Sequence, residues 1–406
     1  MLRVTAFTLT GLLVASAAFA QTPGSPWPGV DPRAPNAPDQ KPAVAGQTRA
    51  PEKKLGVAFK VVPVADGFQN PWSLAFLPGG KMLVTERPGR LRVVSADGSK
   101  SEPVAGLPAV DARNQGGLLD VALDPAFAKN GLIYWSYSEP GPDGANNTAV
   151  ARGTFVDGAA PRVDHVQVIF HQAPSLDSRL HFGSRLVWGR DGTLFITMGD
   201  RSITEGRMQA QRMDGLLGKI ARINADGSIP KDNPFVNASG AVPSIWTLGN
   251  RNPEGLAIDP RSGLMWGSDN GPTGGDELNL VEKGRNYGWG VVSMGLQPGI
   301  TRQHQDGMDD PIRYYTPSIA PSGIHFYTGS RYPGWKNSLF LSALAGQKLI
   351  RYEINGRKVT HEEVVFKGFG RVRQVITGPD GYLYVLIQNS QSLANSPGMV
   401  IRLLPQ

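Results

Sequence analysis

The stretch GLAIDPRSGLMWGSDN, residues Gly255–Asn270, predicts the architecture of the whole chain. Two apolar runs flank a turn of Asp, Pro, Ser and Gly, which is the pattern of a β-hairpin. The pattern recurs five more times, at Ser73–Glu86, Asp120–Tyr137, Arg185–Asp200, Gly323–Leu344 and Gln374–Asn389. Six similar hairpins favour radial repetition, so we predict an all-β fold, a six-bladed β-propeller of four-stranded antiparallel blades. A pair of β-sandwiches is the alternative.

Composition and the end of the chain agree with this architecture. The 406 residues include 50 glycines and 33 prolines, which suits many short strands joined by turns. The run GMVIRLL at Gly398–Leu404 is expected to pair with a strand near Phe59–Val64, because propellers often close their ring in this way.

The first part of the chain predicts export. Residues 1–20, MLRVTAFTLTGLLVASAAFA, have a positive end, a short apolar run and a small-residue cleavage site at Ala20, as in a signal peptide. The apolar run is too short to span a bilayer comfortably, and no later segment approaches that length. Residues 21–54 are rich in proline and predict a disordered linker, so residues 55–406 form the expected propeller domain. A chain without cysteine suits a periplasmic or secreted protein that needs no disulfides.

The charge balance narrows the class of ligand. The formal net charge is +7, but the basic residues are scattered and do not alternate with aromatic residues. Nucleic-acid binding is therefore poorly supported, whereas an anionic ligand held by a few arginines suits the balance.

A histidine and an aspartate flank one hairpin. His181 precedes the hairpin Arg185–Asp200, and Asp200 ends it. A hairpin brings its two ends together, so Asp200 is expected to approach His181 and orient its imidazole as a general base. The alternative is an aspartate that only caps a turn.

Further polar residues gather in Ser244–Trp289, around the hairpin quoted first. Arg251 and Asn252 follow an expected strand and could hold oxygens of a planar ligand, although such a pair also serves as a turn device. Arg371 and Arg373 alternate along another expected strand and so point to one face, toward an anion or toward solvent.

An acidic loop follows the first-quoted hairpin. The sequence DNGPTGGDE offers backbone carbonyls at Gly271 and Pro272 and carboxylates at Asp269, Asp276 and Glu277. Hard oxygen ligands of this kind suit calcium, although the spacing is not that of an EF-hand and acidic Gly-rich loops are often plain turns. No motif for zinc, for a serine nucleophile or for a phosphate loop is present in the sequence.

Together these segments resemble the soluble quinoprotein glucose/sorbosone dehydrogenase family, and more specifically its aldose sugar dehydrogenase branch. The resemblance runs from about Phe68 to Leu404. It rests on the ordered motifs PWSLAFLPGGKMLVTERPGRL, NQGGLLDVALDP, SRLVWGRDGTLFITMGD, GLLGKIARINADGSIPKDNPF, LGNRNPEGLAIDP, GPTGGDELNLVEKGRNYGWG and VRQVITGPDGYLYVL. It implies a six-bladed propeller that binds pyrroloquinoline quinone (PQQ) and calcium and oxidises aldoses to lactones.

The resemblance also implies roles for residues. His181 would take the proton from the anomeric hydroxyl, Asp200 would orient it, and Arg251 would stabilise the oxygen charge that develops on the cofactor. The other implied quinone contacts are Gln115, Asn252, Arg371 and Arg373. Gly271 and Pro272 match the carbonyl ligands of a calcium beside PQQ, and Glu277 and Tyr287 match a second, structural calcium site. Electrons would leave to an external acceptor, a cytochrome or a membrane quinone.

One position departs from the family pattern. The family usually has a lysine after the strand that here reads LFLSAL, whereas this chain has Ala345. Lys348 is expected to supply the missing charge from a shifted position. Two other functions stay open at this point: a calcium-dependent propeller lactonase or hydrolase, and a non-catalytic sugar-binding propeller.

Overall fold

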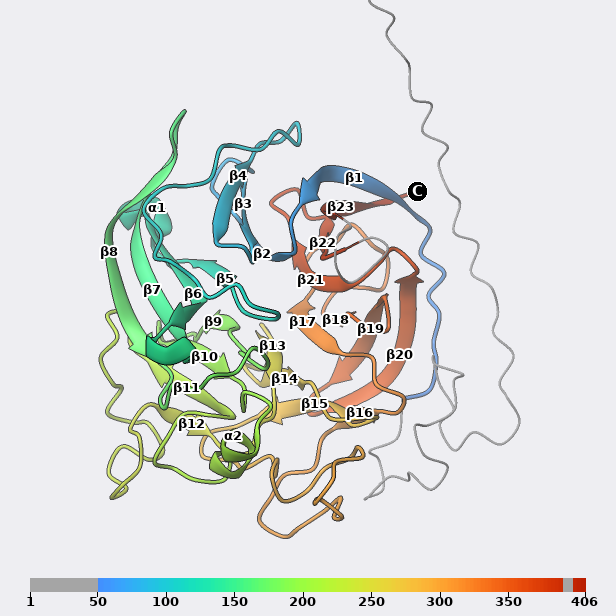
Figure 1. The fold of residues 1–406 in the computed structure, drawn as a ribbon. Coiled ribbons are helices and arrows are strands. Elements are labelled where there is room, and N and C mark those ends of the chain that lie inside the picture. Colours follow the sequence, from blue (N-terminus) through green and yellow to red (C-terminus); the bar gives the residue numbers. More distant parts are fainter. Residues whose placement is uncertain (1–49, 390–396) are drawn as a thin grey trace, which may run out of the picture.

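Six antiparallel sheets are arranged in a ring around a central axis in the computed structural model (Figure 1). The structure describes residues 50–389 and 397–406. The expected signal peptide and most of the expected linker, residues 1–49, lie outside the described part. The six-bladed all-β propeller predicted from the hairpins is thereby confirmed.

The blades follow one another along the chain. Blade 1 contains β2 (Pro71–Phe76), β3 (Met82–Glu86) and β4 (Arg90–Val94); blade 2 contains β5 (Leu118–Leu123), β6 (Leu132–Pro140), β7 (Asn146–Val156) and β8 (Arg162–His171); blade 3 contains β9 (Leu186–Trp188), β10 (Leu194–Met198), β11 (Lys219–Ile223) and β12 (Ile245–Thr247). Blade 4 contains β13 (Pro253–Ile258), β14 (Met265–Asp269), β15 (Asp276–Val281) and β16 (Arg313–Tyr315); blade 5 contains β17 (Pro321–Phe326), β18 (Leu339–Ala343), β19 (Lys348–Asn355) and β20 (Lys358–Lys367); blade 6 contains β21 (Val372–Thr377), β22 (Leu383–Ile387), β23 (Gly398–Pro405) and β1 (Phe59–Phe68). The short helices are α1 (Phe127–Asn130), α2 (Thr204–Gln209) and the 3-10 turn η1 (Pro142–Gly144). Within the described residues five blades have four strands, and blade 1 has three plus an isolated bridge between Val94 and Lys100.

Each predicted hairpin forms the two innermost strands of its blade. In the hairpin Gly255–Asn270, Ile258 pairs with Met265 and Gly255 with Ser268. Its turn is closed by the side chain of Asp259, whose Oδ1 accepts a hydrogen bond from the backbone N–H of Arg261 at 3.0 Å. Local turn chemistry therefore explains why these segments were recognisable without tertiary information.

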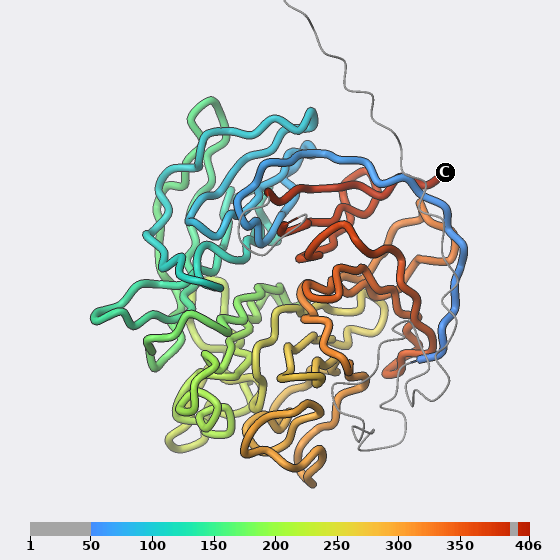
Figure 2. The backbone as a smooth tube through the Cα atoms, turned by 45° about the vertical axis from the view of Figure 1, so that its right-hand side comes forward, coloured from blue at the N-terminus to red at the C-terminus, as the bar shows by residue number. Residues whose placement is uncertain are grey.

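Blade 6 joins the two ends of the propeller. β1 pairs antiparallel with β23, from Phe59 opposite Pro405 to Phe68 opposite Gly398. Figure 2 shows the blue N-terminal strand lying along the red C-terminal strand. The expected pairing is present, and it holds the two ends of the propeller domain together in one blade, which closes the ring.

The apolar core lies between blades. Among the described residues, six large clusters of buried apolar side chains each span one pair of neighbouring blades. Between blades 4 and 5, for example, Trp266 of β14 packs in one cluster with Leu341 of β18. The centre of the ring is thus left to the inner strands and their loops, where polar side chains collect.

Residues 50–54, assigned above to the linker, lie along blade 5. Ala50 is buried in the cluster between blades 4 and 5. The backbone N–H of Lys53 donates to the carbonyl of Glu362 at 3.0 Å, and the N–H of Glu362 donates to the carbonyl of Pro51 at 3.1 Å. None of the helices in the described ranges is long and apolar enough to cross a membrane.

Candidate functional site

Most of the expected site residues lie at one face of the ring. Each inner strand begins, and its hairpin partner ends, at the same face because the two are antiparallel. His181 and Gln115 lie in loops that lead into β9 and β5, and Asp200 follows β10. Arg251 and Asn252 precede β13, and the loop before β5 extends toward the centre of the ring in Figure 1. The topology therefore gathers these residues from separate blades.

His181 and Asp200 are in direct contact. His181 Nδ1 lies 2.6 Å from Asp200 Oδ1, and both side chains are buried. The loop holds this geometry closely: a Cβ on Gly199 would lie 2.0 Å from the carbonyl oxygen of His181, so glycine is needed there. Gln115 Oε1 accepts the backbone N–H of His181 at 2.8 Å. The sequence predicted this approach because the two ends of a hairpin lie together, and His181 and Asp200 do flank the hairpin of β9 and β10.

The protonation state of this pair suits a base. Burial lowers the pKa of His181, and the hydrogen bond with Asp200 only partly opposes this. For Asp200, burial acts to raise the pKa, but the hydrogen bond from His181 and the neighbouring charges outweigh it, so its pKa is lowered. An ionised carboxylate only accepts, so Nδ1 of His181 carries the proton and Nε2 keeps its lone pair. Nε2 therefore can take a proton from a bound hydroxyl.

Two further donors complete the shell of Asp200. Trp289 Nε1 donates to Asp200 Oδ2 at 2.6 Å, and the backbone N–H of Ser202 donates to Oδ1 at 2.7 Å. Sequence reasoning did not assign Trp289 to the site. It belongs to the loop after β15 in blade 4, and no local pattern indicates that it reaches a carboxylate of blade 3.

Arg251 lies beside the pair and is well held. Its Nη1 donates to the carbonyls of Asn270 and Gly271, each at 2.8 Å, and its backbone N–H donates to Asp269 Oδ2 at 2.9 Å. The guanidinium carbon lies 5.1 Å from the ring centroid of Trp289. Burial lowers the pKa of Arg251, while the charges of Asp200 and of Asp269 favour its cationic form. Its buried Nε has no partner among the described residues, so one donor is left for a ligand.

Asn252 and Gln115 act as supports in this structure. Asn252 Oδ1 accepts the backbone N–H of Gly183 at 2.9 Å, and its Nδ2 donates to Glu254 Oε1 at 3.2 Å. Its backbone N–H donates to Asp269 Oδ1 at 2.6 Å. The side chains of Gln115 and Asn252 thus both bind the backbone of the loop that carries His181, at His181 and at Gly183.

Three arginines surround a single carboxylate nearby. Arg373 pairs with Glu254 and also donates its Nε to Gln388 Oε1 at 3.1 Å. Arg371 and Arg87 are different: the buried Nε of each has no partner among the described residues. Burial lowers the pKa of both groups, and the charge of Glu254 acts in the opposite direction. One carboxylate cannot neutralise three guanidinium groups, so this region is arranged for an anion.

Arg87 was missed by the sequence analysis. It directly follows β3, at the same end of blade 1 where Asp200 follows β10 in blade 3. The charge of Arg371 acts together with burial to lower its pKa. The signal that could have found it is its position: a charged residue just past the second strand of a predicted hairpin.

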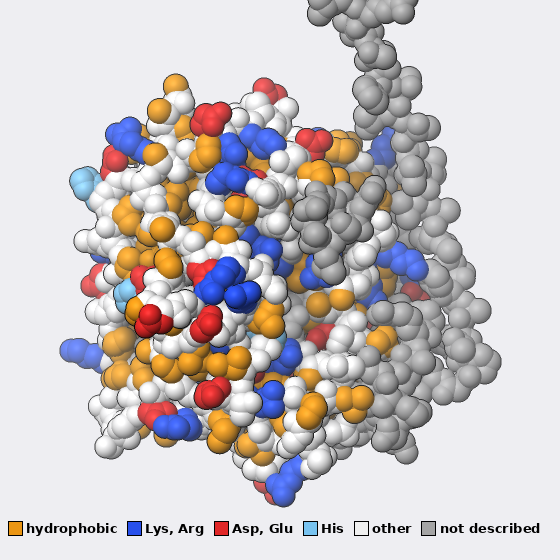
Figure 3. All heavy atoms as spheres, viewed as in Figure 1, with side chains coloured by type: hydrophobic (Ala, Val, Ile, Leu, Met, Phe, Trp, Pro, Cys, Tyr) orange, Lys and Arg blue, Asp and Glu red, His pale blue; other side chains and the backbone are white. Residues whose placement is uncertain are grey.

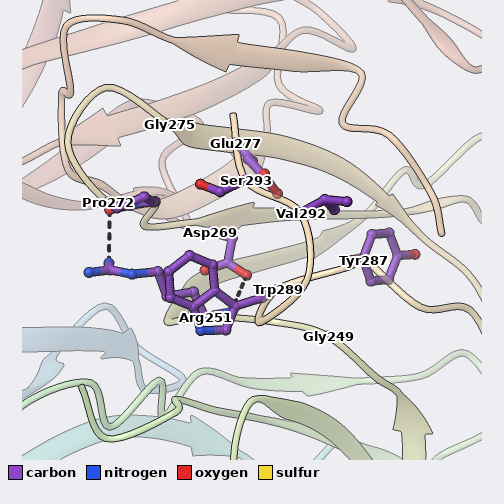
Figure 4. A pocket seen from close by; sticks show the side chains of 11 residues that line it. Gly249, Arg251, Asp269, Pro272, Gly275, Glu277, Tyr287, Trp289, Val292 and Ser293 are labelled. Atoms are coloured by element: carbon purple, nitrogen blue, oxygen red, sulfur yellow. Dashed lines mark hydrogen bonds between the residues drawn. The ribbon is translucent and has the colours of Figure 1, made fainter. Parts of the chain in front are cut away.

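The acidic loop forms a second polar region, beside Arg251. Figure 4 shows Asp269, Glu277 and Ser293 around the pocket next to Arg251 and Trp289. Burial raises the pKa of Asp269 to about 6, of Asp276 to about 7 and of Glu277 to about 8. Buried carboxylates with raised pKa values favour a neighbouring cation.

The expected cation ligands have partners within the protein. The Gly271 carbonyl accepts from Arg251, and the Pro272 carbonyl accepts from Ser318 Oγ at 3.0 Å. The hydroxyl of Tyr287 donates to the carbonyl of Leu280 at 2.5 Å, so this hydroxyl is committed to the backbone even though Tyr287 lines the pocket. Within the described ranges, no group of three or more His, Cys, Asp or Glu side chains has the arrangement of a metal site.

The remaining expected residue, Lys348, begins β19. It is buried and pairs across the sheet with Ala343 and Lys367. Ala345 lies exposed in the loop before it. Compensation of Ala345 by Lys348 stays a prediction.

Comparisons with known proteins agree with the fold and identify the family. The model of the family described as Glucose / Sorbosone dehydrogenase matches residues 68–395. The chain is 43% identical over 333 residues to the aldose sugar dehydrogenase YliI of Escherichia coli K12, a match that covers 80% of this chain and 89% of that protein.

Solved structures give the same result. The apo-form of the soluble aldose sugar dehydrogenase from Escherichia coli superposes with a TM-score of 0.79 and 39% identity, over 86% of this chain and 100% of that one. The PQQ-bound form of the aldose sugar dehydrogenase from Streptomyces coelicolor superposes with a TM-score of 0.71 and 27% identity, over 88% of this chain and 100% of that one.

Proposed function

The chain belongs to the glucose/sorbosone dehydrogenase family, and on that premise we propose that it is a PQQ-dependent aldose sugar dehydrogenase that oxidises the anomeric carbon to give a lactone. The observation that carries the proposal is the buried His181–Asp200 pair, whose free Nε2 lies in the same loop cluster as Arg251.

The residues of this chain would handle the proton. His181 Nε2 takes the proton as the O–H bond of the anomeric hydroxyl breaks. Asp200 holds the imidazole in the productive tautomer and stabilises the imidazolium that forms. Arg251, held by two carbonyls, supplies a fixed positive charge for the negative charge that develops on an oxygen. Bound PQQ would supply the two-electron acceptor for the hydride that leaves the anomeric carbon.

The arginines suit a ligand with several carboxylates. Arg87 and Arg371 have donors without partners, and the charge of Glu254 is already shared with Arg373. We assign the carboxylates of PQQ to Arg87 and Arg371, with Arg373 as a third, compensated cation. Gln115 and Asn252 support the base rather than the ligand, because their side-chain oxygens are already occupied. The donor set therefore fits the cofactor.

We further propose that the acidic loop holds calcium, which the raised pKa values of its carboxylates favour. Gly271 and Pro272 would offer carbonyl oxygens to an ion beside the cofactor, and Glu277 would offer its half-buried carboxylate, with Tyr287, to a second ion. An ion would supply the positive charge that Asp269, Asp276 and Glu277 need in order to stay ionised at neutral pH.

We place the protein in the periplasm or outside the cell, after removal of a signal peptide near Ala20. An aldose is the substrate, and an external cytochrome or quinone takes the electrons. Figure 3 shows basic and acidic side chains interspersed over the face of the propeller that Figure 1 presents. This pattern suits a small neutral substrate as well as a protein acceptor.

Addition of PQQ and calcium to the purified apoprotein tests the proposal. We expect a difference absorption spectrum of bound PQQ and the appearance of glucose oxidation coupled to a dye. His181→Ala should keep the spectrum and lose turnover. Inactivity across a panel of aldoses, with PQQ demonstrably bound, would contradict the proposal. Lactone hydrolysis without PQQ would favour the hydrolase alternative instead.

A further inference from the structure

The carboxylate of Asp200 is held by three donors from three places in the chain. His181 and Ser202 contact Oδ1, and the indole N–H of Trp289 contacts Oδ2 at 2.6 Å. Trp289 belongs to the loop that follows β15, in the neighbouring blade. The buried carboxylate thus links two blades at the site.

Trp289 is itself fixed by the surrounding backbone. The backbone N–H of Trp289 donates to the carbonyl of Gly249 at 2.9 Å, and the backbone carbonyl of Trp289 accepts from Gln211 Nε2 at 2.9 Å. The next residue, Gly290, has a φ of 97°, and a Cβ there would lie 2.8 Å from the carbonyl oxygen of Arg207. These contacts give the indole a defined position before any ligand binds.

The indole of Trp289 donates to a carboxylate, whereas the indole of Trp188 donates to a backbone carbonyl, that of Leu123. Among the described residues, four other tryptophans have a buried indole nitrogen without any partner: Trp135, Trp246, Trp266 and Trp335. The described part of the protein thus supplies no acceptor to these four indoles, whereas it supplies one to Trp289. The indole of Trp289 donates to a carboxylate, and that carboxylate belongs to Asp200, which binds His181.

The ring of Trp289 has a second contact. The guanidinium carbon of Arg251 lies 5.1 Å from its centroid, and that of Arg207 lies 5.8 Å away. A guanidinium over an indole face is held by the negative potential of the ring. The side chain of Trp289 thus contacts both Asp200, through its indole N–H, and Arg251, through its ring.

We propose that Trp289 is a positioning residue that sets the orientation and the basicity of the His181–Asp200 pair through its indole N–H. This inference rests on the proposed function only for its catalytic consequence. A carboxylate can rotate about its last bond, and the donor at Oδ2 prevents this rotation while it draws charge away from Oδ1. Without the N–H, Oδ2 stays buried with no donor, and more negative charge faces the imidazole.

The test compares Trp289→Phe with Trp246→Phe. Both variants keep an aromatic ring beside an arginine, because Arg222 lies 5.1 Å from the ring centroid of Trp246. They differ in the bond that is lost, since the indole nitrogen of Trp246 has no partner among the described residues. Trp246→Phe therefore controls for the loss of an indole.

The first readout needs neither PQQ nor turnover. NMR titration of the apoprotein should show that Trp289→Phe raises the pKa of His181 by about half a unit to one unit, whereas Trp246→Phe leaves it unchanged. In the wild-type apoprotein the indole N–H signal of Trp289 should be shifted downfield and should follow the titration of His181. An unchanged His181 pKa in folded Trp289→Phe overturns the proposal. Should that variant not fold, an indole signal in the wild type that ignores the His181 titration overturns it equally.

The second readout is turnover of the reconstituted protein. Trp289→Phe should lower kcat by about 10- to 100-fold, as loss of an outer support typically does, with KM for the sugar within about twofold of the wild-type value. The acid limb of kcat should move to higher pH. If His181→Ala keeps its turnover while Trp289→Phe still shifts the His181 pKa, the proposed base is wrong and the positioning role of Trp289 stands. Wild-type kcat and pH profile in Trp289→Phe would contradict that role.

Discussion

Replacement of Arg87 and Arg371 by glutamine separates the binding of a cofactor from the stability of the fold. Both guanidinium groups have buried nitrogens without partners, and both are close to Glu254, which already pairs with Arg373. The apoprotein therefore bears the cost of two partly buried cations that share a single carboxylate with Arg373. Glutamine keeps the hydrogen-bonding capacity and most of the volume but removes the charge.

The expected effect on PQQ binding follows from one lost charged bond in each variant. Removal of one partner of a buried charged pair costs about 2–5 kcal/mol. At about 1.4 kcal/mol per tenfold, this corresponds to roughly 30- to 4,000-fold weaker binding of PQQ. The apoprotein should meanwhile unfold at an equal or higher temperature, because a partly buried cation that shares its carboxylate with Arg373 has been removed.

Fluorescence titration with PQQ measures the first effect, and thermal unfolding of the apoprotein measures the second. Arg162→Gln is a matched control, because Arg162 is exposed and pairs with Asp164 on the outer strand β8. It should leave both quantities unchanged. Wild-type PQQ affinity in both single variants would refute the assignment of the anion site to Arg87 and Arg371.

Three further outcomes are expected. Because burial lowers the pKa of His181 below that of an ordinary histidine, kcat/KM should be retained above about pH 6.5 and lost as the pH falls through this lowered pKa, which a pH–rate profile measures. His325 accepts the backbone N–H of Thr377 at 3.1 Å and has its pKa lowered to about 4 by burial. As the pH falls, the histidine of the unfolded chain is protonated at a higher pH than His325 in the folded protein. The free energy of unfolding should therefore fall between about pH 6.5 and 4. Urea unfolding of His325→Gln should show a weaker dependence of this free energy on pH in that range. Leu403→Ala should cost about 2–5 kcal/mol of stability, because Leu403 is fully buried between blades 5 and 6, whereas the exposed Leu296→Ala should cost less than about 0.5 kcal/mol in the same denaturation assay.

The parts of the fold that were predictable are those that depend on residues close together in the sequence. The hairpin Gly255–Asn270 was recognisable because Asp259 closes its turn and the flanking residues are apolar. The approach of Asp200 to His181 followed from the same logic, since the two ends of one hairpin must meet. Closure by β1 and β23 followed from an apolar run at each end of the propeller domain.

The parts that were not predictable depend on the angle between blades. Trp289 contacts Asp200 from the next blade, and Arg87 of blade 1 and Arg371, just before blade 6, both feel the charge of Glu254 in blade 4. Periodicity assigns a residue to a face of its own strand, but it does not say which side chain of another blade lies opposite. The support roles of Gln115 and Asn252 were hidden for the same reason, because an amide that binds a backbone group looks like one that binds a ligand.

The most direct measurement of the central claim is a single turnover without an electron acceptor. The protein is loaded with PQQ and calcium, mixed anaerobically with glucose, and followed by the absorbance of the bound quinone. The account predicts rapid reduction in the wild-type protein, slower reduction when the C1 hydrogen of glucose is deuterium, and no reduction in His181→Ala that still binds PQQ. Reduction of the quinone at the wild-type rate in His181→Ala would contradict it.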